Sequence, residues 1–240
     1  MRKTLIFGAV ALLFSANAHA ENSKWQQLDN IPDCRVWNEL PEPNEFATWS
    51  GACRDGHAEG EGVLAWHAPI KETISHHVYV GHMHRGKLHG HGVYTWPDGS
   101  RYEGMWNRDN RHGNGVYTQP DGARYDGQWK NDYWHGMGTT FDTFGHKIYA
   151  GDWIVGQRSG YGIETFNCPQ NMPDGIASMI LKISACGMTY DGNWKDGLPN
   201  GEGTLITPYL GSYSGNWTNG CLKKFYVLNL TFGVDSETCK

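Results

Sequence analysis

The segment Tyr102–Trp129 reads YEGMWNRDNRHGNGVYTQPDGARYDGQW, and it begins and ends with the same phrase. In that phrase Tyr, an acidic residue, Gly, any residue and Trp follow one another, and the second phrase starts at Tyr125, 23 residues after the first. A further pair of glycines, Gly113 and Gly115, lies between the two phrases. A phrase that recurs with a period of about 20 to 50 residues is typical of a protein built from stacked repeats.

The repeat extends in both directions along the chain. When each copy is counted from its first aromatic residue as position 0, Gly occupies positions 2, 11 and 13, and Trp usually occupies position 4. Copies 1 to 6 begin at Trp49, Tyr79, Tyr102, Tyr125, Tyr149 and Tyr190, and a final half copy begins at Tyr213. Cys53 and Met83 replace the Trp in copies 1 and 2. Six copies in phase predict an all-β repeat array.

Each copy is expected to form a β-hairpin, with strands at positions 0–5 and 10–17 and a turn at positions 6–9. The expected cross-strand pairs in copy 3 are Tyr102 with Tyr117, Gly104 with Gly115, and Trp106 with Gly113. Strand side chains alternate between faces, so these residues share one face, and the indole should lie over glycines that lack a Cβ atom. Pro-Asp-Gly at 97–99 and 120–122 predicts turns between hairpins. The chain should therefore be a continuous meander.

The phrase Y-x-G-x-W followed by G-x-G at this period resembles the MORN (membrane occupation and recognition nexus) repeat over roughly Trp49–Trp217. The resemblance implies an elongated, twisted antiparallel β-meander of stacked hairpin repeats that stays open. It also implies a binding or scaffolding role, with no catalytic activity and no cofactor.

The N-terminal residues have the features of a signal peptide. Arg2 and Lys3 precede an apolar run, and Ala18-His19-Ala20 has the pattern of a cleavage site, so we expect cleavage after Ala20 and a periplasmic or secreted protein. Without Arg2 and Lys3, Lys+Arg falls from 20 to 18 against 25 Asp+Glu, which gives a net charge of −7. That charge argues against nucleic acid as a partner and does not support docking on an anionic membrane.

Six cysteines in an exported chain predict disulfides, although six allow 15 pairings. We expect neighbouring pairs, namely Cys34–Cys53, Cys168–Cys186 and Cys221–Cys239. The expected organisation is a signal peptide at 1–20, an N-terminal cap at 21–48, the repeat array at 49–218 with an inserted hairpin at 167–189, and a C-terminal cap strand at 219–240. Disulfides would thus tie both ends of the array.

No catalytic motif is present: the chain lacks G-x-S-x-G, H-E-x-x-H and a phosphate-binding loop. A hydrolase with its site in the insertion therefore ranks last among our hypotheses. The weak candidate for a metal site is a His cluster in copy 2, where His82 would pair with His91 and His84 with His89. A structural or pH-sensing role is favoured, because His89, His112 and His135 all occupy position 10. We expect no bound metal.

The turns differ from copy to copy and are the expected recognition surface, because loops on a rigid scaffold often carry binding. The predicted binding residues are Arg85, Arg108, Arg111, Tyr133 and Trp134. The main hypothesis is an exported, non-enzymatic protein that binds a protein partner at the bacterial cell envelope. The alternative is a module for glycans or lipid headgroups, in which Trp66, Trp96 and Trp134 would stack on sugar rings.

Overall fold

The computed structural model describes residues 24–39, 41, 43–70, 73–167, 187–208 and 210–222. The described residues form strands and turns, and none of them belongs to a helix that could cross a bilayer. The strands are β1 (Trp25–Gln27), β2 (Arg35–Trp37), β3 (Phe46–Trp49), β4 (Ala52–Arg54), β5 (His57–Ile70), β6 (Thr73–His84), β7 (Lys87–Thr95), β8 (Arg101–Asn107), β9 (Asn110–Thr118), β10 (Arg124–Lys130), β11 (Tyr133–Phe141), β12 (Lys147–Ile154), β13 (Gln157–Thr165), β14 (Thr189–Lys195), β15 (Leu198–Thr207), β16 (Gly211–Thr218) and β17 (Cys221–Leu222).

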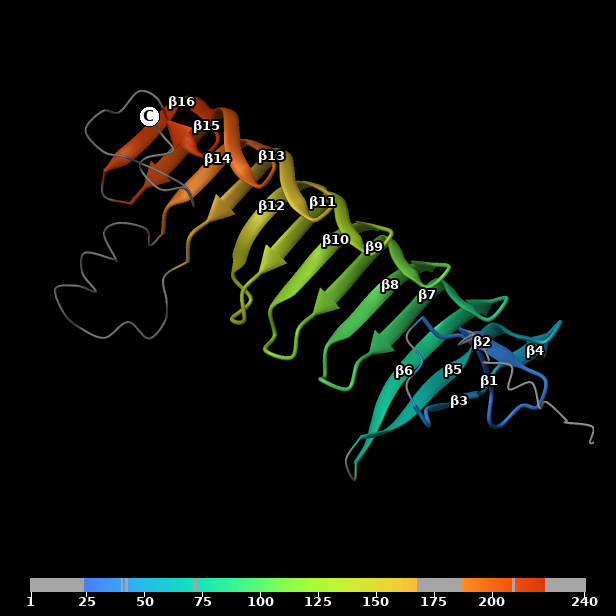
Figure 1. Cartoon of the computed structure of the whole chain (residues 1–240). Helices are drawn as coiled ribbons and strands as arrows, with labels where there is room; N and C mark the ends of the chain where they lie inside the picture. Colours follow the sequence, from blue (N-terminus) through green and yellow to red (C-terminus); the bar gives the residue numbers. More distant parts are fainter. Residues whose placement is uncertain are drawn as a thin grey trace, which may run out of the picture.

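The repeats form one elongated, twisted sheet that does not close on itself (Figure 1). From β5 to β17 every strand pairs antiparallel with the next one in the chain. The first hairpin is completed by two short strands, because β4 pairs with the beginning of β5 and β3 pairs with its later part. The predicted all-β meander of stacked hairpins is confirmed.

The two long edges of the sheet carry different turns. The tips within each copy are two-residue turns at positions 6 and 7, and in copy 3 these residues, Arg108 and Asp109, have φ of 51° and 71°. Two positive φ values define a type I′ turn, whose twist matches that of the flanking strands. The turn is therefore shorter than the predicted positions 6–9. At the opposite edge Gly99 has φ of 88° and donates to Trp96 O, as the Pro-Asp-Gly sequence predicts.

The register within each hairpin is interrupted by a bulge. In copy 3 Tyr102 faces Tyr117 and Gly104 faces Gly115, as expected. The register then shifts, so Trp106 pairs with Arg111, and the predicted pairing of Trp106 with Gly113 is wrong. The cause is Gly113, whose φ of 61° bends the second strand at position 11. The glycine is needed there for its backbone conformation rather than for space.

The position 0 ring, not the indole, lies over the two close glycines. A Cβ atom at Gly115 would overlap the ring and hydroxyl of Tyr102, which corrects the predicted placement of the indole. The Tyr102 hydroxyl donates to Met105 O at 2.9 Å, and burial raises its pKa, which keeps the donor proton in place. The hydroxyls of Tyr79, Tyr125, Tyr149 and Tyr190 make the equivalent hydrogen bond.

The position 4 indole instead joins consecutive copies. Trp129 packs edge-on between Tyr102 of copy 3 and Tyr125 of its own copy, with ring centroids 5.3 and 5.1 Å away. Its Nε1 donates to Gly115 O at 3.0 Å, again in the preceding copy. The same hydrogen bond is made by Trp106, Trp153, Trp194 and Trp217. Each interface thus combines ring packing with one specific hydrogen bond to the preceding copy.

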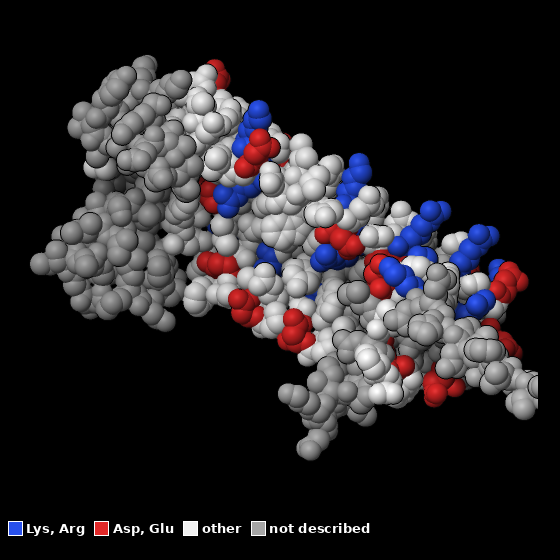
Figure 2. Space-filling view, in the orientation of Figure 1, with Lys and Arg blue, Asp and Glu red and all other residues white. Residues whose placement is uncertain are grey.

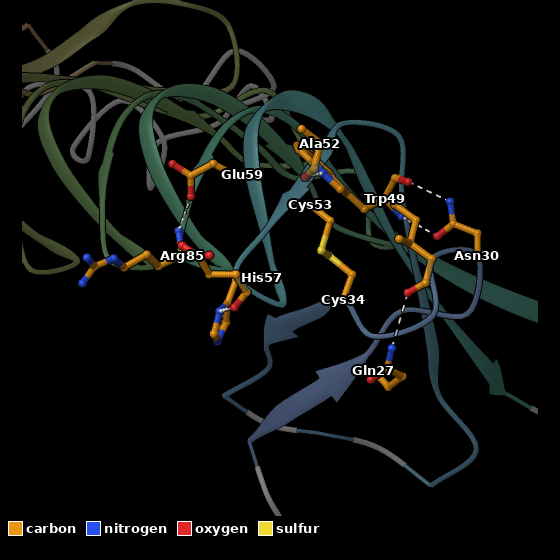
Figure 3. The surroundings of a disulfide bond; sticks show 11 residues. Gln27, Asn30, Cys34, Trp49, Ala52, Cys53, His57, Glu59 and Arg85 are labelled. Carbon is orange, nitrogen blue, oxygen red and sulfur yellow. Dashed lines mark hydrogen bonds between the residues drawn. A yellow bond between two sulfur atoms is a disulfide. The ribbon is translucent and has the colours of Figure 1, made fainter.

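The N-terminal cap is fastened to copy 1 by the predicted Cys34–Cys53 disulfide (Figure 3). Cys53 occupies position 4, where later copies have Trp. Asn30 adds two hydrogen bonds, since its side chain donates to Trp49 O at 2.7 Å and accepts from Trp49 N at 3.0 Å. The cap therefore holds the first repeat through one covalent link and a side-chain clamp.

The other predicted disulfides involve residues outside the described part of the chain. Cys168, Cys186 and Cys239 all lie there, so the 168–186 and 221–239 pairings stay predictions. Cys221 is disulfide-bonded. The predicted signal peptide, most of the inserted hairpin and the C-terminal cap beyond 222 also fall outside the described residues.

Candidate functional site

Charge is separated between two surfaces of the array. The turn edge, defined as positions 5–10 of the six full copies, carries eight Lys and Arg against five Asp and Glu. The open face, defined as positions 1, 3, 12 and 14 on the side of the sheet away from the Tyr rings, carries six Asp and Glu and no Lys or Arg. Basic side chains accordingly follow the upper edge of the sheet in Figure 2. The two surfaces would attract partners of opposite charge.

Three of the five predicted binding residues are exposed on the turn edge. Arg85 and Arg108 are exposed at position 6 of their copies, and 56 % of Tyr133 is accessible. The Arg85 N–H donates to Glu59 Oε2 at 2.8 Å, which fixes the backbone of the tip and leaves the guanidinium outside (Figure 3). These three residues are accessible on the turn edge, and their role in recognition stays a prediction.

The other two predicted residues, Arg111 and Trp134, are part of the framework. Arg111 Nε lies 2.9 Å from Asp132 Oδ1, and its guanidinium lies 4.4 Å from the centre of the Trp129 ring. Trp134 stacks on Tyr125 with ring centroids 4.5 Å apart. Both occupy position 9, whose side chain points to the ring face, whereas position 8 points outward. Their role is to cover the Tyr and Trp rings at the end of each hairpin.

The His cluster of copy 2 does not adopt the predicted pairing. The bulge places His84 opposite Lys87 rather than His89, and His84 Nδ1 lies 3.0 Å from Glu59 Oε1. The ring centroids of His82 and His89 are 6.4 Å apart, and burial lowers the pKa of His89. Within the described residues, no three His, Cys, Asp or Glu side chains are grouped to hold a metal ion.

The three Trp residues considered for glycan stacking are packed into the fold. Trp66 is buried, and Trp96 lies 4.5 Å from the Tyr94 ring, measured between centroids. Trp134 has its face covered by Tyr125, as described above. They pack beside the repeated Tyr and Trp rings and do not form an exposed strip.

The open face carries an apolar surface that the sequence interpretation missed. Met137 and Tyr161 are 61 % and 53 % exposed, and Ile163 is exposed beside them. They line a groove of about 350 Å³ over copies 4 and 5, together with Asp126, Gly138, Thr139, Ala150, Gly151 and Asp152. The Tyr161 hydroxyl donates to Asp191, which fixes the ring at the side of the groove. Apolar residues at positions 12 and 14 were the available sequence signal.

Asp109 is a partly buried carboxylate that links two turn tips. Its Oδ1 accepts from Leu88 N at 2.8 Å, and Lys87 Nζ lies 3.3 Å from Oδ2 without hydrogen-bond geometry. Burial raises the pKa of Asp109 to about 6 in spite of these contacts. Ionisation of this side chain therefore destabilises the fold.

We expect Asp109→Asn to stabilise the protein near neutral pH by roughly 2 kcal/mol, because the amide keeps the Leu88 hydrogen bond and never ionises. The folded pKa lies above the unfolded value, so wild-type stability falls as pH rises between about 4 and 6. The difference in melting temperature should be close to zero near pH 4 and largest above pH 6.5. Thermal unfolding across this range measures it, and a difference independent of pH would contradict the prediction.

Stacked hairpins, an open sheet and two exposed surfaces define a repeat-based binding module. Five stretches match the MORN repeat family, at residues 79–101, 102–124, 125–141, 149–167 and 190–208. They coincide with copies 2 to 6, so the chain carries MORN repeats.

Curated relatives also resemble the chain. It is similar to Alsin of Homo sapiens, with 30 % identity over 169 residues, and to Alsin of Mus musculus, with 29 % identity over the same length. The similarity covers 70 % of this chain but only 8 % of each relative. This likeness, together with the repeat matches, supports a repeat-based binding module.

Proposed function

We propose that this chain is an exported, non-enzymatic MORN repeat protein that binds a protein partner at the bacterial cell envelope. The observation that carries the proposal is the apolar groove on the open face. Met137 and Tyr161 expose more than half of their surface there, next to Ile163. Contiguous exposed apolar side chains rimmed by polar groups are characteristic of protein-interaction sites.

The groove favours a partner segment that is both apolar and basic. Asp126 and Asp152 line it, and Asp191 lies at its side through the hydrogen bond from Tyr161. The open-face positions hold six Asp and Glu and no Lys or Arg, so a Lys- or Arg-bearing segment would meet an excess of carboxylates there. Met137 has an adaptable side chain that suits a binding surface.

Export is supported by two independent features. Residues 1–20 have the pattern of a signal peptide, and the Cys34–Cys53 disulfide is of a kind that persists in oxidising compartments. The glycan alternative has less support, because Trp66, Trp96 and Trp134 are packed against neighbouring aromatic rings.

A pulldown from envelope extract tests the proposal. Met137→Ser with Tyr161→Ser should remove at least one partner that the wild type recovers, because the two changes eliminate the largest apolar area of the groove. The matched control is Val63→Ser with Val80→Ser, two exposed residues on the same face at copies 1 and 2. Recovery of every partner by the groove variant at wild-type yield would contradict the proposal.

A further inference from the structure

Strand β2 of the cap binds the turn edge through main-chain hydrogen bonds that a strand of another protein could also form. Arg35 N donates to Gly56 O at 3.0 Å, and Trp37 N donates to Gly86 O at 2.8 Å. Gly56 and Gly86 both occupy position 7, in copies 1 and 2. N–H groups two residues apart in a strand point the same way and are separated by about 6.6 Å. The tips of copies 1 and 2 therefore present acceptors that alternate N–H groups of one β-strand can reach.

One hydrogen bond that joins the first two tips is repeated along the whole edge. In each copy the position 7 N–H donates to the position 9 carbonyl of the copy before it. The donors are Gly86, Asp109, Asp132, Gly156, Gly197 and Gly220, and the hydrogen bonds measure 2.8 to 3.1 Å. Beyond β2, the carbonyls of Asp109, Asp132 and Gly156 continue the row. Of these three, only Asp132 O accepts a side-chain hydrogen bond from a described residue, which is Arg111.

The part of the edge beyond β2 also exposes large apolar side chains. Tyr133, Ile154 and Val155 are each more than half exposed, and they lie together because Gly156 N donates to Trp134 O. Val155 has φ of 49°, a left-handed conformation that is unfavourable for a β-branched residue. The equivalent turn position holds Asp, Arg or Asn in every other copy. An apolar side chain kept in spite of backbone strain points to a binding role.

The charges of this segment select the partner. Arg108 and Lys130 are exposed on the turn edge of copies 3 and 4. Asp109 and Asp132, the acidic residues on the neighbouring tips, are engaged by Lys87 and Arg111. An occupant with carboxylates would therefore meet unpaired cations.

We propose that an extended acidic segment of a partner protein, carrying a large apolar residue, binds along the turn edge of copies 3 to 5 in continuation of β2. Alternate N–H groups of the segment donate to the carbonyls of Asp109, Asp132 and Gly156, and its apolar side chain packs on Tyr133 and Val155. This surface is separate from the open-face groove, so either site can fail without the other.

The probe is an acetylated decapeptide in which Glu alternates with Ile, Val and Tyr, and its binding is measured by fluorescence anisotropy. Two further peptides carry N-methyl groups, one on the amides of the Glu residues and one on the amides of the apolar residues. If the peptide binds as a strand through one alternate set of its N–H groups, one of the methylated peptides should bind at least about tenfold more weakly. The other should bind like the unmethylated peptide. Replacement of Glu by Lys should weaken binding as well.

The protein variant is Val155→Asn, since Asn tolerates the left-handed conformation. We expect it to melt at the same temperature as the wild type or higher, and to bind the Glu peptide about tenfold more weakly. Met137→Ser on the open face should bind it as the wild type does. The proposal is overturned if the Glu peptide does not bind, if both methylated peptides bind equally, if Val155→Asn binds like the wild type, or if Met137→Ser loses binding.

Discussion

Replacement of Gly115 by Val should destabilise the protein by about 3 kcal/mol or more, at the upper end of the usual cost of overpacking. The new Cβ atom would overlap the Tyr102 ring and hydroxyl. The ring cannot move aside, because its hydroxyl is bonded to Met105 O and its edge is packed by Trp129. Gly115 O also accepts the Trp129 indole N–H, so a shift of the backbone would weaken the interface between copies 3 and 4. Urea and thermal unfolding measure the change.

The control for strand propensity is Asn114→Val, which places the same side chain one residue earlier on the open face. It should change stability by less than about 0.5 kcal/mol. A second test is a double-mutant cycle with Gly115→Ala and Tyr102→Leu. Leucine at position 102 is smaller than tyrosine and leaves free space above the glycines. The cost of Gly115→Ala should fall in the Tyr102→Leu background. Equal costs in both backgrounds would show that the ring is not what excludes a side chain.

The sequence predicts the repeat, the meander and the close glycine pair, because these depend on strict periodicity. It does not distinguish the two reasons for a glycine. Gly104 and Gly115 leave room for Tyr102, whereas Gly113 supplies a positive φ at the bulge. In the sequence, a glycine required for space cannot be distinguished from a glycine required for a positive φ. The predicted indole placement and the pairing of His84 failed for this reason.

The candidate surfaces are predictable to a smaller degree. The type I′ turn fixes which side chains near each tip point outward. Tyr133 is therefore exposed, whereas Trp134, its neighbour in sequence, stacks on Tyr125. The open-face groove depends on cross-strand neighbours, because Ala150 pairs with Ile163 and lies beside Thr139. Such a surface becomes visible only once the register is known. The binding of β2 to the tips likewise depends on a contact between cap and array that no local pattern encodes.

Loss of the Cys34–Cys53 disulfide should destabilise the N-terminal end by about 3 kcal/mol, as expected for a link between residues 19 apart in sequence. In a stacked array each unit contacts only its neighbours, so the damage should stay local. The cap would open first, since β2 is held to copies 1 and 2 by two main-chain hydrogen bonds, from Arg35 and Trp37. The variant is Cys34→Ala with Cys53→Ser, because Cys34 is buried and Cys53 is exposed.

Hydrogen exchange measured by mass spectrometry locates the effect. The amides of Arg35 and Trp37 should lose protection by about a hundredfold, which corresponds to the expected free energy. The amides of β14, five copies away from the disulfide, should exchange in the variant as in the wild type. Reduction of the wild-type protein should reproduce the loss of protection at Arg35 and Trp37, which separates loss of the bond from the substitutions themselves; the comparison with β14 is made in the variant, because a reductant also opens the disulfide of Cys221. Unchanged protection at Trp37 would mean that β2 is held on the turn tips by its own hydrogen bonds and by Asn30. Equal loss across all copies would instead show that the array unfolds as one cooperative unit, since the disulfide would then limit global rather than local opening.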